Sequence, residues 1–458
     1  MPLNLALSAS FESYVDEVIR TYGAAGIAVA IVDREQPVQE LFFGFRDRER
    51  KLLIDKDTIF GLASVSKSFT CLAVLRLAEQ GKIDLNAPVS RYIPAFQNAH
   101  QPQPVLVRHL MSHAGGFWPV ARNTVEPLAR KMGMWNGGVD LAYSVPFSEE
   151  AILEVCAGLN AQEKPLGQPG EYFSYSNDSF GLLSDIIRTQ GGEDTYADYM
   201  KKRILRPLGM DRSGCGFLPP AADVNAATLY EERDGKLLIT RDYHDDAFVM
   251  MGGGAMKSTI RDMERYLQLY LQAGAPLISV GSFRDMTTSH ASYRPSAGYG
   301  YGLSVGALAG CPIFGHGGSL TGVSSAISFC PDAGYGVVVL CNTSGVPSTA
   351  VAEAAMRWCL GLEPRPVPPV AASPWPVALQ QKACGQYVSP EGSDILISTA
   401  SSGLQIHSSG RLCEYRFGPP DILWLQSKLT WSDLTLFHDA GGDVFAVRYG
   451  GRMLARQP

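Results

Sequence analysis

Charge is sparse in this sequence and is not gathered into clusters of one sign. Aspartate, glutamate, lysine and arginine make up 18% of the 458 residues, against about 25% in a typical globular protein. The 39 basic and 45 acidic residues give a formal net charge of −6 at pH 7. A protein that binds a phosphate backbone needs a basic patch, so we expect no nucleic acid partner.

Long apolar runs and paired cysteines are also missing. No apolar stretch approaches the roughly 20 residues of a membrane-spanning helix, and the start MPLNLAL has no basic leader or long apolar core. The nine cysteines stand singly, without CxxC pairs or histidines at zinc spacing. We therefore expect no membrane span, no metal or cofactor, and a reducing, cytoplasmic location.

Apolar residues, by contrast, make up 46% of the chain, and its length allows two or three domains at about 150 residues each. Their spacing predicts helices at 11–22, 64–81 and 180–189, and strands at 26–32, 40–43, 299–304, 324–330 and 335–341. This pattern predicts an α/β fold built on one antiparallel sheet.

Six prolines between residues 361 and 376 mark a stiff, extended connector. Beyond residue 379 the sequence has short strand-like runs separated by turn residues, which predicts a small β-barrel. We therefore predict a catalytic domain at 1–362, a linker at 363–378 and a barrel domain at 379–458. The long aromatic stretch 117–147 has little periodicity and is a candidate lid.

The segment Ser64-Val-Ser-Lys67 places a hydroxyl and an amine three residues apart at the start of a predicted helix. Residues at this spacing share one helix face, and Ser64 lies near the unpaired N–H groups of the first turn. This geometry suits a serine nucleophile with a base beside it. Taken alone, the same spacing also fits a capped surface helix.

Two later segments carry polar groups next to turn or glycine residues. Tyr175 and Asn177 follow a Pro-Gly turn and precede a predicted helix, although a lone Tyr175 also fits a packed core aromatic. The run Gly-His-Gly-Gly-Ser at 315–319 lets another group approach its backbone closely. By itself, the same run also fits a tight turn in which His316 is a hydrogen-bonded structural residue.

Together and in this order, the three motifs resemble those of the serine β-lactamase and penicillin-binding protein superfamily. The resemblance is closest to its class C β-lactamase-like branch of esterases, D-aminopeptidases and transesterases, and it covers residues 11–362. Further stretches that look like landmarks of the family lie at 81–89, 108–116, 207–210 and 252–259. The resemblance implies an antiparallel sheet flanked by helices, a helical subdomain and a lipocalin-like C-terminal barrel.

The resemblance also implies a role for each motif residue. Ser64 is the expected acylated nucleophile, Lys67 its base or base partner, and Tyr175 the phenol that passes a proton to the leaving group. Asn177 is expected to hold the substrate amide or Lys67. The backbone N–H groups of Ser64 and Ser319 are expected to form the oxyanion hole, without any metal.

His316, Gly317 and Gly318 are the expected substrate-binding residues of the third motif. His316 stands where many relatives carry lysine, so we expect no fixed positive charge for a substrate carboxylate and poor turnover of carboxylate-bearing β-lactams beside neutral esters or amides. Because its reference pKa is about 6.5, we expect the ring to be mostly neutral at pH 7 and to titrate between about pH 5.5 and 7.5. We also expect Lys67 and Tyr175 to lower each other's pKa, since an ammonium favours the phenolate and burial disfavours the ammonium.

We therefore predict a serine hydrolase or acyltransferase that forms an acyl-enzyme at Ser64 and acts on esters or amides, including D-amino acid peptides. One alternative is a peptide cyclase or transesterase, in which a bound amine or alcohol outcompetes water. Another is a noncatalytic acyl-binding sensor, which Tyr175 and Asn177 disfavour. The expected partner is a small-molecule or peptide acyl substrate, with a possible homodimer.

Overall fold

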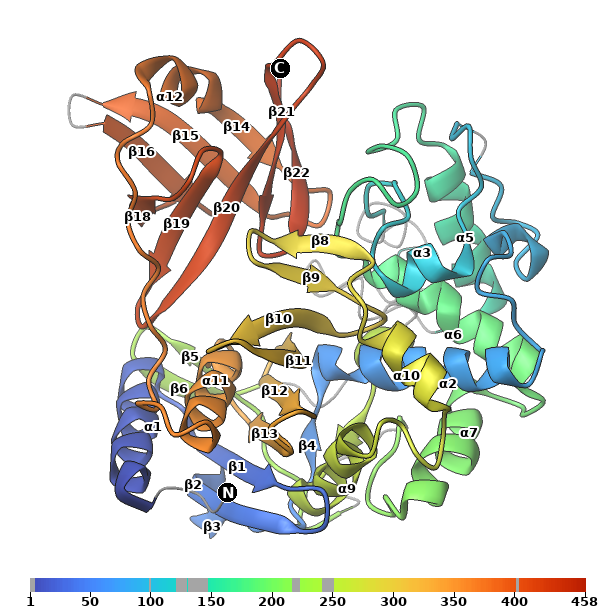
Figure 1. Ribbon diagram of the computed structural model, residues 1–458, viewed down its shortest axis with the longest axis vertical. Helices are drawn as coiled ribbons and strands as arrows, with labels where there is room; N and C mark the ends of the chain where they lie inside the picture. The colour runs from blue at the N-terminus through green and yellow to red at the C-terminus, as the bar shows by residue number, and fades with distance from the viewer. Residues whose placement is uncertain are drawn as a thin grey trace.

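Two nine-stranded antiparallel sheets, each built from its own part of the chain, organise the protein (Figure 1). The computed structural model describes residues 5–98, 100–120, 130, 147–215, 223–240, 251–400 and 403–458. The order of strands in the first sheet is β3-β2-β1-β13-β12-β11-β10-β9-β8. These strands are β1 (Gly26–Val32), β2 (Pro37–Asp47), β3 (Leu52–Leu53), β8 (Ala291–Arg294), β9 (Ala297–Tyr299), β10 (Ser304–Leu308), β11 (Cys311–Leu320), β12 (Val323–Cys330) and β13 (Tyr335–Cys341).

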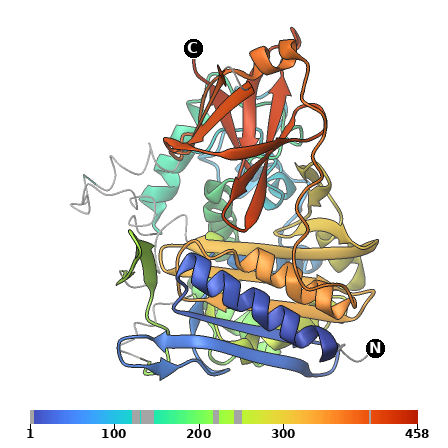
Figure 2. The same ribbon diagram turned by 90° about the vertical axis from the view of Figure 1, so that its left-hand side faces the viewer.

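The centre of the first sheet is covered on both faces, which explains its unbroken apolar strands. All residues of β1, β12 and β13 are buried. Alternate side chains of a strand point to opposite faces, so Ile27, Val29 and Ile31 pack in one apolar cluster with the helices α1 (Ser8–Tyr22) and α11 (Ser348–Cys359). Figure 2 shows these two helices side by side on that face.

The other face of the sheet carries the helical part of the fold, which lies on the right in Figure 1. Its central helix α2 (Ser66–Glu79) is buried over most of its length. Around it lie the other helices of this part: α3 (Val107–Met111), α5 (Glu149–Asn160), α6 (Asn177–Gly191), α7 (Tyr196–Tyr199), α8 (Met251–Gly254), α9 (Ile260–Leu271) and α10 (Val280–Met286). The two-stranded pairs are β4 (Phe60–Gly61) with β7 (Lys257–Ser258) and β5 (Tyr230–Arg233) with β6 (Lys236–Ile239).

The second sheet closes into a nearly complete barrel with its own apolar core. Its order is β17-β16-β15-β14-β22-β21-β20-β19-β18, preceded by the helix α12 (Val377–Ala383). The strands are β14 (Gly385–Val388), β15 (Asp394–Ala400), β16 (Gly403–Ser408), β17 (Arg411–Leu412), β18 (Glu414–Phe417), β19 (Ile422–Ser427), β20 (Thr430–His438), β21 (Val444–Tyr449) and β22 (Arg452–Arg456).

The predicted fold class is confirmed, namely an antiparallel sheet flanked by helices with a helical subdomain and a small C-terminal barrel. One predicted element is wrong. Residues 299–304 are not a strand, because they contain the turn between β9 and β10, with Gly302 at φ +67°. The run 315–319 is not a tight turn either, since it lies inside β11. Most of the candidate lid 117–147 lies outside the described residues.

The proline-rich segment after α11 runs from the first domain to the barrel and is anchored at both ends. Arg365 forms an ion pair with Glu17 of α1 at 2.6 Å, and Trp375 is buried in the barrel core. The exact domain boundaries stay a prediction. Within the described part of the chain, no helix combines the length and apolarity needed to cross a membrane.

Candidate active site

Ser64 lies in a short 3-10 turn, Ala63–Val65, between strand β4 and helix α2. The strand fixes the start of this turn, because the Leu62 N–H donates to the Met256 carbonyl at 2.8 Å. Ala63 has φ +46°, a left-handed value that is uncommon outside glycine. Ser64 is partly exposed while its neighbours from 58 to 75 are buried. The local backbone therefore presents one hydroxyl to solvent.

Lys67 lies one helical turn after Ser64, as the spacing predicts, and is fully buried. Its Nζ lies 3.3 Å from Ser64 Oγ, 2.8 Å from Asn177 Oδ1 and 2.8 Å from the Gly253 carbonyl oxygen. A neutral amine has two N–H groups, which here face Asn177 Oδ1 and the Gly253 carbonyl, so its lone pair is left on the side of Ser64 Oγ. The side chain is therefore fixed with its nitrogen facing the serine hydroxyl.

Tyr175 and Asn177 enter the site from the start of helix α6. Ser176 caps this helix by accepting the Ser179 N–H at 3.3 Å, so the preceding backbone is extended. Tyr175 hydrogen-bonds Ser64 through its side chain, and Lys67 Nζ lies 4.7 Å from the centre of its ring. The first two sequence motifs, which lie far apart in the chain, therefore meet around the Ser64 hydroxyl.

The two titratable side chains that face Ser64 have pKa values shifted in opposite directions. Burial lowers the pKa of Lys67 well below its usual value, and the nearby charge of Arg452 lowers it further. Burial raises the pKa of Tyr175, and the opposing effects of the Ser64 hydrogen bond and Arg452 are smaller. The expected mutual lowering is thus wrong for Tyr175, whose pKa is raised, and the pKa of Lys67 is lowered by burial and Arg452 rather than by Tyr175.

The third motif brings strand β11 alongside the turn that carries Ser64. A Cβ atom built on Gly318 would lie 2.3 Å from the Leu62 carbonyl oxygen and 3.1 Å from Ala63 Cβ. Only glycine allows this close approach, which sets Ser319 at the same end of β11. Gly317, the residue before it, is also closely packed. A Cβ atom built on Gly317 would lie 2.5 Å from Thr349 Cγ2.

His316 is buried and is held on both ring nitrogens. Its Nδ1 lies 2.5 Å from the Gly317 carbonyl oxygen and its Nε2 lies 2.8 Å from the Tyr299 hydroxyl. Burial and the neighbouring Lys67 lower its pKa to about 3. The ring is therefore neutral at pH 7, as the sequence predicts. The expected titration between pH 5.5 and 7.5 is wrong, because the ring is not solvated.

Arg452 is a site residue that the sequence motifs did not reveal. It begins strand β22 of the barrel, and its guanidinium carbon lies 4.9 Å from the centre of the Tyr175 ring. Glu391, from the turn after β14, forms an ion pair with it. The Tyr175 N–H also donates to the Gly451 carbonyl at 2.9 Å. A fixed positive charge, which the lack of lysine at 316 seemed to remove, is therefore supplied by the second domain.

His113 is the second residue that was missed as a site residue, although it falls in the landmark stretch 108–116. It is 1% exposed, and its ring centre lies 4.2 Å from that of Tyr175. Its Nδ1 accepts the Ser176 N–H at 3.0 Å, and its carbonyl accepts the Ser174 N–H at 2.9 Å. His113 thus holds the segment that carries Tyr175 on both sides of that residue.

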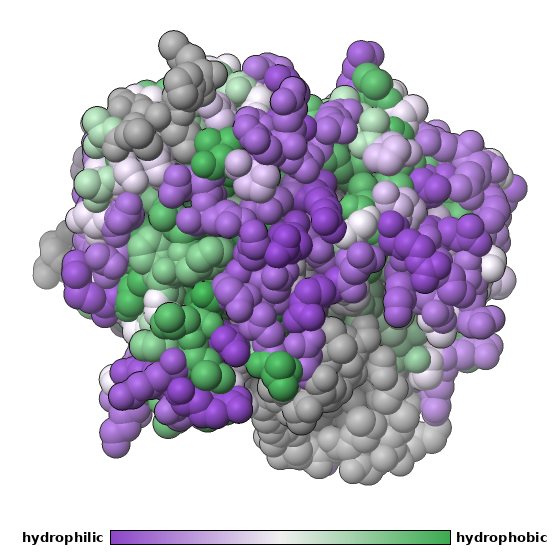
Figure 3. Space-filling model, turned by 90° about the horizontal axis from the view of Figure 1, so that it is seen from below, coloured by the Kyte–Doolittle hydropathy of each residue, from purple (hydrophilic) through white to green (hydrophobic). Residues whose placement is uncertain are grey.

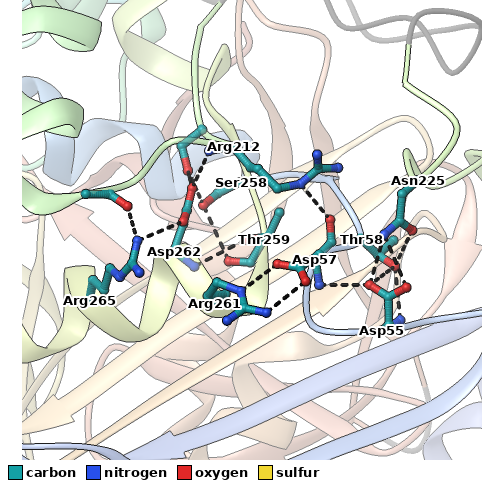
Figure 4. A network of polar contacts seen from close by, with 12 residues as sticks. Asp55, Asp57, Thr58, Arg212, Asn225, Ser258, Thr259, Arg261, Asp262 and Arg265 are labelled. Carbon is teal, nitrogen blue, oxygen red and sulfur yellow. Dashed lines mark hydrogen bonds and ion pairs between the residues drawn. The ribbon is translucent and has the colours of Figure 1, made fainter.

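A polar network supports the approach to strand β4, which leads into Ser64 (Figure 4). Asp57 accepts two hydrogen bonds from Arg261 of α9, at 2.6 and 2.9 Å. Asp55 accepts a hydrogen bond from the Asn225 amide at 2.9 Å. The Thr58 hydroxyl lies within donating distance of both, at 3.3 Å from Asp55 Oδ1 and 2.9 Å from Asn225 Oδ1. These bonds tie the loop before β4 to α9, so the nucleophile turn has a fixed starting point.

Fold and site together place a serine at a helix start, a buried lysine and a tyrosine around its hydroxyl, and a glycine-rich strand beside them. Within the described residues, no group of three or more histidine, cysteine or acidic side chains could hold a metal. The chain belongs to the beta-lactamase family, whose sequence pattern it matches over residues 11–359.

Individual relatives support the same membership. Esterase EstB of Burkholderia gladioli is 31% identical over 218 residues, which cover 46% of this chain and 52% of that protein. The D-alanyl-D-alanine-carboxypeptidase/endopeptidase AmpH of Escherichia coli (strain K12) is 25% identical, over 57% of this chain and 61% of that protein. The chain thus matches about half to three fifths of the length of these relatives.

Solved structures extend the similarity to the whole chain. The octameric penicillin-binding protein homologue from Pyrococcus abyssi superposes with a TM-score of 0.69 at 25% identity, covering 98% of this chain and 99% of that one. The similarity therefore includes the barrel as well as the catalytic domain.

Proposed function

We propose that this protein is a serine hydrolase of esters or amides that works through an acyl-enzyme at Ser64. The observation that carries the proposal is the position of Lys67, whose desolvated nitrogen lies 3.3 Å from the Ser64 hydroxyl. A buried lysine with a lowered pKa is a competent base near neutral pH, which an exposed lysine is not. Its fixed contacts to Asn177 and Gly253 keep it in that position.

The proposed reaction has two steps. Ser64 Oγ attacks the carbonyl carbon while Lys67 takes the hydroxyl proton, and the backbone N–H groups of Ser64 and Ser319 stabilise the oxyanion. The bond to the leaving alcohol or amine then breaks, and the leaving group receives a proton through Tyr175. Water attacks the ester at Ser64 in the second step, which releases the acid and restores the serine hydroxyl.

The proposed substrates carry a carboxylate close to the scissile bond. Arg452 provides a guanidinium next to Tyr175, and its five N–H donors allow it to bind a substrate carboxylate in addition to Glu391. Peptides with a free carboxyl end, including D-amino acid peptides, have this chemistry. An esterase and a D-alanyl-D-alanine-carboxypeptidase/endopeptidase among the relatives support the ester and amide classes. Transfer to a bound amine or alcohol, as in a cyclase or transesterase, is the alternative second step for the same acyl-enzyme.

Intact-mass spectrometry tests the proposal. The parent is expected to gain the mass of one fluorophosphonate group and, with an activated ester, of one acyl group. Ser64→Ala is expected to lose both mass gains and to lower ester hydrolysis by several orders of magnitude, with unchanged melting temperature. The exposed Ser292→Ala serves as the control and is expected to behave like the parent. Full labelling of Ser64→Ala would identify another nucleophile and reject the proposal.

We also infer that copies of the chain associate and that the protein works in a reducing compartment, as the cytoplasm is. One structural relative is octameric, and exposed apolar side chains lie on β3, β6 and the segment before β5, namely Leu53, Leu238, Ile239 and Val224. Figure 3 shows apolar patches among hydrophilic ones on the lower face. All nine cysteines are unpaired, which supports the reducing compartment. Light scattering on the full chain measures the assembly.

A further inference from the structure

His113 is a buried residue in a backbone conformation that histidine seldom adopts. It lies two residues after the end of helix α3, and its φ of +54° is in the left-handed region. Its side chain is 1% exposed. Residues in such conformations persist only where the surrounding structure fixes them, and they gather at active sites. The contacts of His113 therefore indicate what this conformation serves.

The hydrogen bonds of His113 fix the backbone on both sides of Tyr175. The Ser174 N–H donates to the His113 carbonyl at 2.9 Å, and the Ser176 N–H donates to His113 Nδ1 at 3.0 Å. The N–H of Tyr175 itself donates to the Gly451 carbonyl at 2.9 Å. Three consecutive N–H groups are thus held, two of them by His113. The direction in which the Tyr175 side chain leaves the backbone is fixed as a result, and its hydroxyl reaches Ser64.

The imidazole of His113 also packs against the phenol ring of Tyr175. The two ring centres lie 4.2 Å apart, with their planes inclined by 31°. Burial and Lys67 lower the pKa of His113 well below its usual value, so the ring is neutral. Because Nδ1 accepts a hydrogen bond, the single ring hydrogen is on Nε2. Further ring centres lie within 5.0 to 5.5 Å, those of Phe173, Phe180 and Tyr299.

Stability alone does not explain this histidine. Its Nε2 is buried and has no hydrogen-bond partner among the described residues. An unpaired buried N–H group is unfavourable, and so is the left-handed backbone. The fold therefore keeps two unfavourable features at one residue, whose two hydrogen bonds to backbone N–H groups both hold the neighbours of Tyr175.

We propose that His113 is a positioning residue that aims the Tyr175 phenol at the leaving group of the substrate. This inference rests on the proposed function, in which Lys67 takes the Ser64 proton. The Tyr175 hydroxyl then gives its proton to the leaving oxygen or nitrogen as the bond from that atom to the carbonyl carbon breaks, and the Lys67 ammonium returns a proton to the phenolate. His113 exchanges no proton. It acts on the departure of the leaving group, because Asn177 and Gly253 position Lys67 independently.

The test compares kcat/KM for the ethyl and p-nitrophenyl esters of butyric acid, measured on the full chain. p-Nitrophenolate departs without a proton, whereas ethanol must be protonated as it leaves. His113→Phe keeps a ring but removes the acceptor of the Ser176 N–H. It is expected to lower kcat/KM for the ethyl ester at least about tenfold more than for the p-nitrophenyl ester, because a displaced proton donor loses its alignment. His113→Ala removes the same acceptor without a larger ring and is expected to shift the ratio of the two esters in the same direction.

Two further variants separate the acceptor from the packing. His113→Asn keeps an acceptor bonded to Cγ, and asparagine tolerates a positive φ, so the ratio is expected to stay within about threefold of the parent. His109→Phe is the matched control. His109 Nδ1 accepts the Leu106 N–H at 3.2 Å, so this variant loses the same kind of bond at the start of α3, away from Tyr175. It is expected to leave the ratio unchanged.

A double variant shows whether His113 acts through Tyr175. In a Tyr175→Phe background, His113→Phe is expected to leave the ratio of the two esters unchanged, because the residue that it positions is gone. A further change there would overturn the inference. So would an equal loss on both esters in His113→Phe and His113→Ala, or a shifted ratio in His113→Asn. If no ester acylates Ser64 in the parent, the proposed function itself has failed.

Discussion

Burial decides which side chains of the site are charged. His113 and His316 are kept neutral because both rings are desolvated and both face Lys67. Lys67 itself is driven toward the neutral amine by the same desolvation. Arg452 keeps its charge, because a guanidinium does not lose its proton in proteins. The one permanent cation beside these two neutral imidazoles and the neutral phenol is Arg452, which is ion-paired with Glu391.

We predict that Arg452→Met lowers kcat/KM for a carboxylate-bearing ester by about 10- to 100-fold relative to a neutral ester, since a charge-assisted hydrogen bond contributes about 1.5–3 kcal/mol. Removing this charge also raises the pKa of Lys67, because Arg452 lowers it in the parent. The rise of kcat/KM with pH for the neutral ester, which follows the loss of the Lys67 proton, is therefore expected at higher pH. Steady-state kinetics between pH 5 and 10 measure both effects.

The matched control for this prediction is Arg456→Met, four residues further along β22. Arg456 donates only to barrel carbonyls, those of Lys382, Cys384 and Val444. It is expected to leave the substrate preference and the acidic limb as in the parent. An equal loss on both esters in Arg452→Met, with an unmoved pH profile, would show that Arg452 only supports the fold.

The β21–β22 hairpin places residues of the barrel beside Tyr175. The turn of the β21–β22 hairpin consists of Gly450 and Gly451, at φ +57° and +78°. A Cβ on Gly451 would lie 3.1 Å from the Tyr293 ring, so glycine lets the turn reach the Tyr175 backbone. Arg448 anchors the same hairpin by donating to the Ser292 carbonyl at 2.6 Å. The hairpin is therefore held between the segment that carries Tyr175 and strand β8.

At helix α9, we predict that Glu264→Gln stabilises the protein increasingly as pH rises from 5 to 9. Burial and the Glu40 carboxylate raise the pKa of Glu264 to about 8, against the opposing charges of Lys56 and Arg261. Between about pH 4.5 and 8 the folded protein holds a proton that the unfolded chain has lost. The free energy of unfolding therefore falls with pH in this window, by up to about 1.4 kcal/mol per unit.

Thermal unfolding at several pH values measures this effect. The glutamine amide stays neutral, so the variant is expected to match the parent near pH 5 and to exceed its melting temperature above pH 8. The exposed Asp16→Asn on α1 is the control and is expected to follow the parent at every pH. A parallel shift at all pH values would mean that the introduced amide improves packing and that Glu264 does not titrate in this window.

At the scale of the whole molecule, the site is assembled from two domains that dock tightly. The barrel contributes the Gly451 carbonyl and Arg452, and Ala446 and Met453 pack in an apolar cluster with Leu166 of the first domain. The barrel therefore contributes a backbone carbonyl and a guanidinium to the surroundings of Tyr175. A barrel that only stabilised a dimer would have no reason to place a guanidinium against Tyr175.

We predict that limited proteolysis cuts the proline-rich segment first, between Val367 and Ala371. Val367 and Val370 are 66% and 87% exposed, whereas Arg365 is held by Glu17 and Trp375 by the barrel core. Exposed, loosely bonded segments are the preferred sites of nicking. Elastase followed by mass spectrometry is expected to give a fragment close to residues 1–362 and a barrel fragment.

The nicked protein also tests the docking. If the two fragments stay together on size exclusion, hydrolysis of a carboxylate-bearing ester should persist, and separation of the fragments should abolish it while sparing labelling of Ser64. First cleavage inside either domain, with the proline-rich segment intact, would contradict both the exposed connector and the predicted boundary.

The sequence by itself determined the parts of this protein that depend on short-range spacing. Helical periodicity places Ser64 and Lys67 on one face, an apolar run predicts β1 at its observed bounds, and Tyr175 and Asn177 lie at the start of a capped helix. The order of the motifs was enough to indicate the family and the fold. Each of these inferences needs only residues that are neighbours in the chain.

The tertiary structure alone decided which side chains of the site are charged and which residues from distant segments surround Tyr175. Arg452 and His113 could not be assigned because they come from segments that meet Tyr175 only after folding. The raised pKa of Tyr175 and the pKa of His316 near 3 depend on how far each ring is removed from water. Solvation and the field of distant charges are properties of the packed molecule, so no local pattern encodes them.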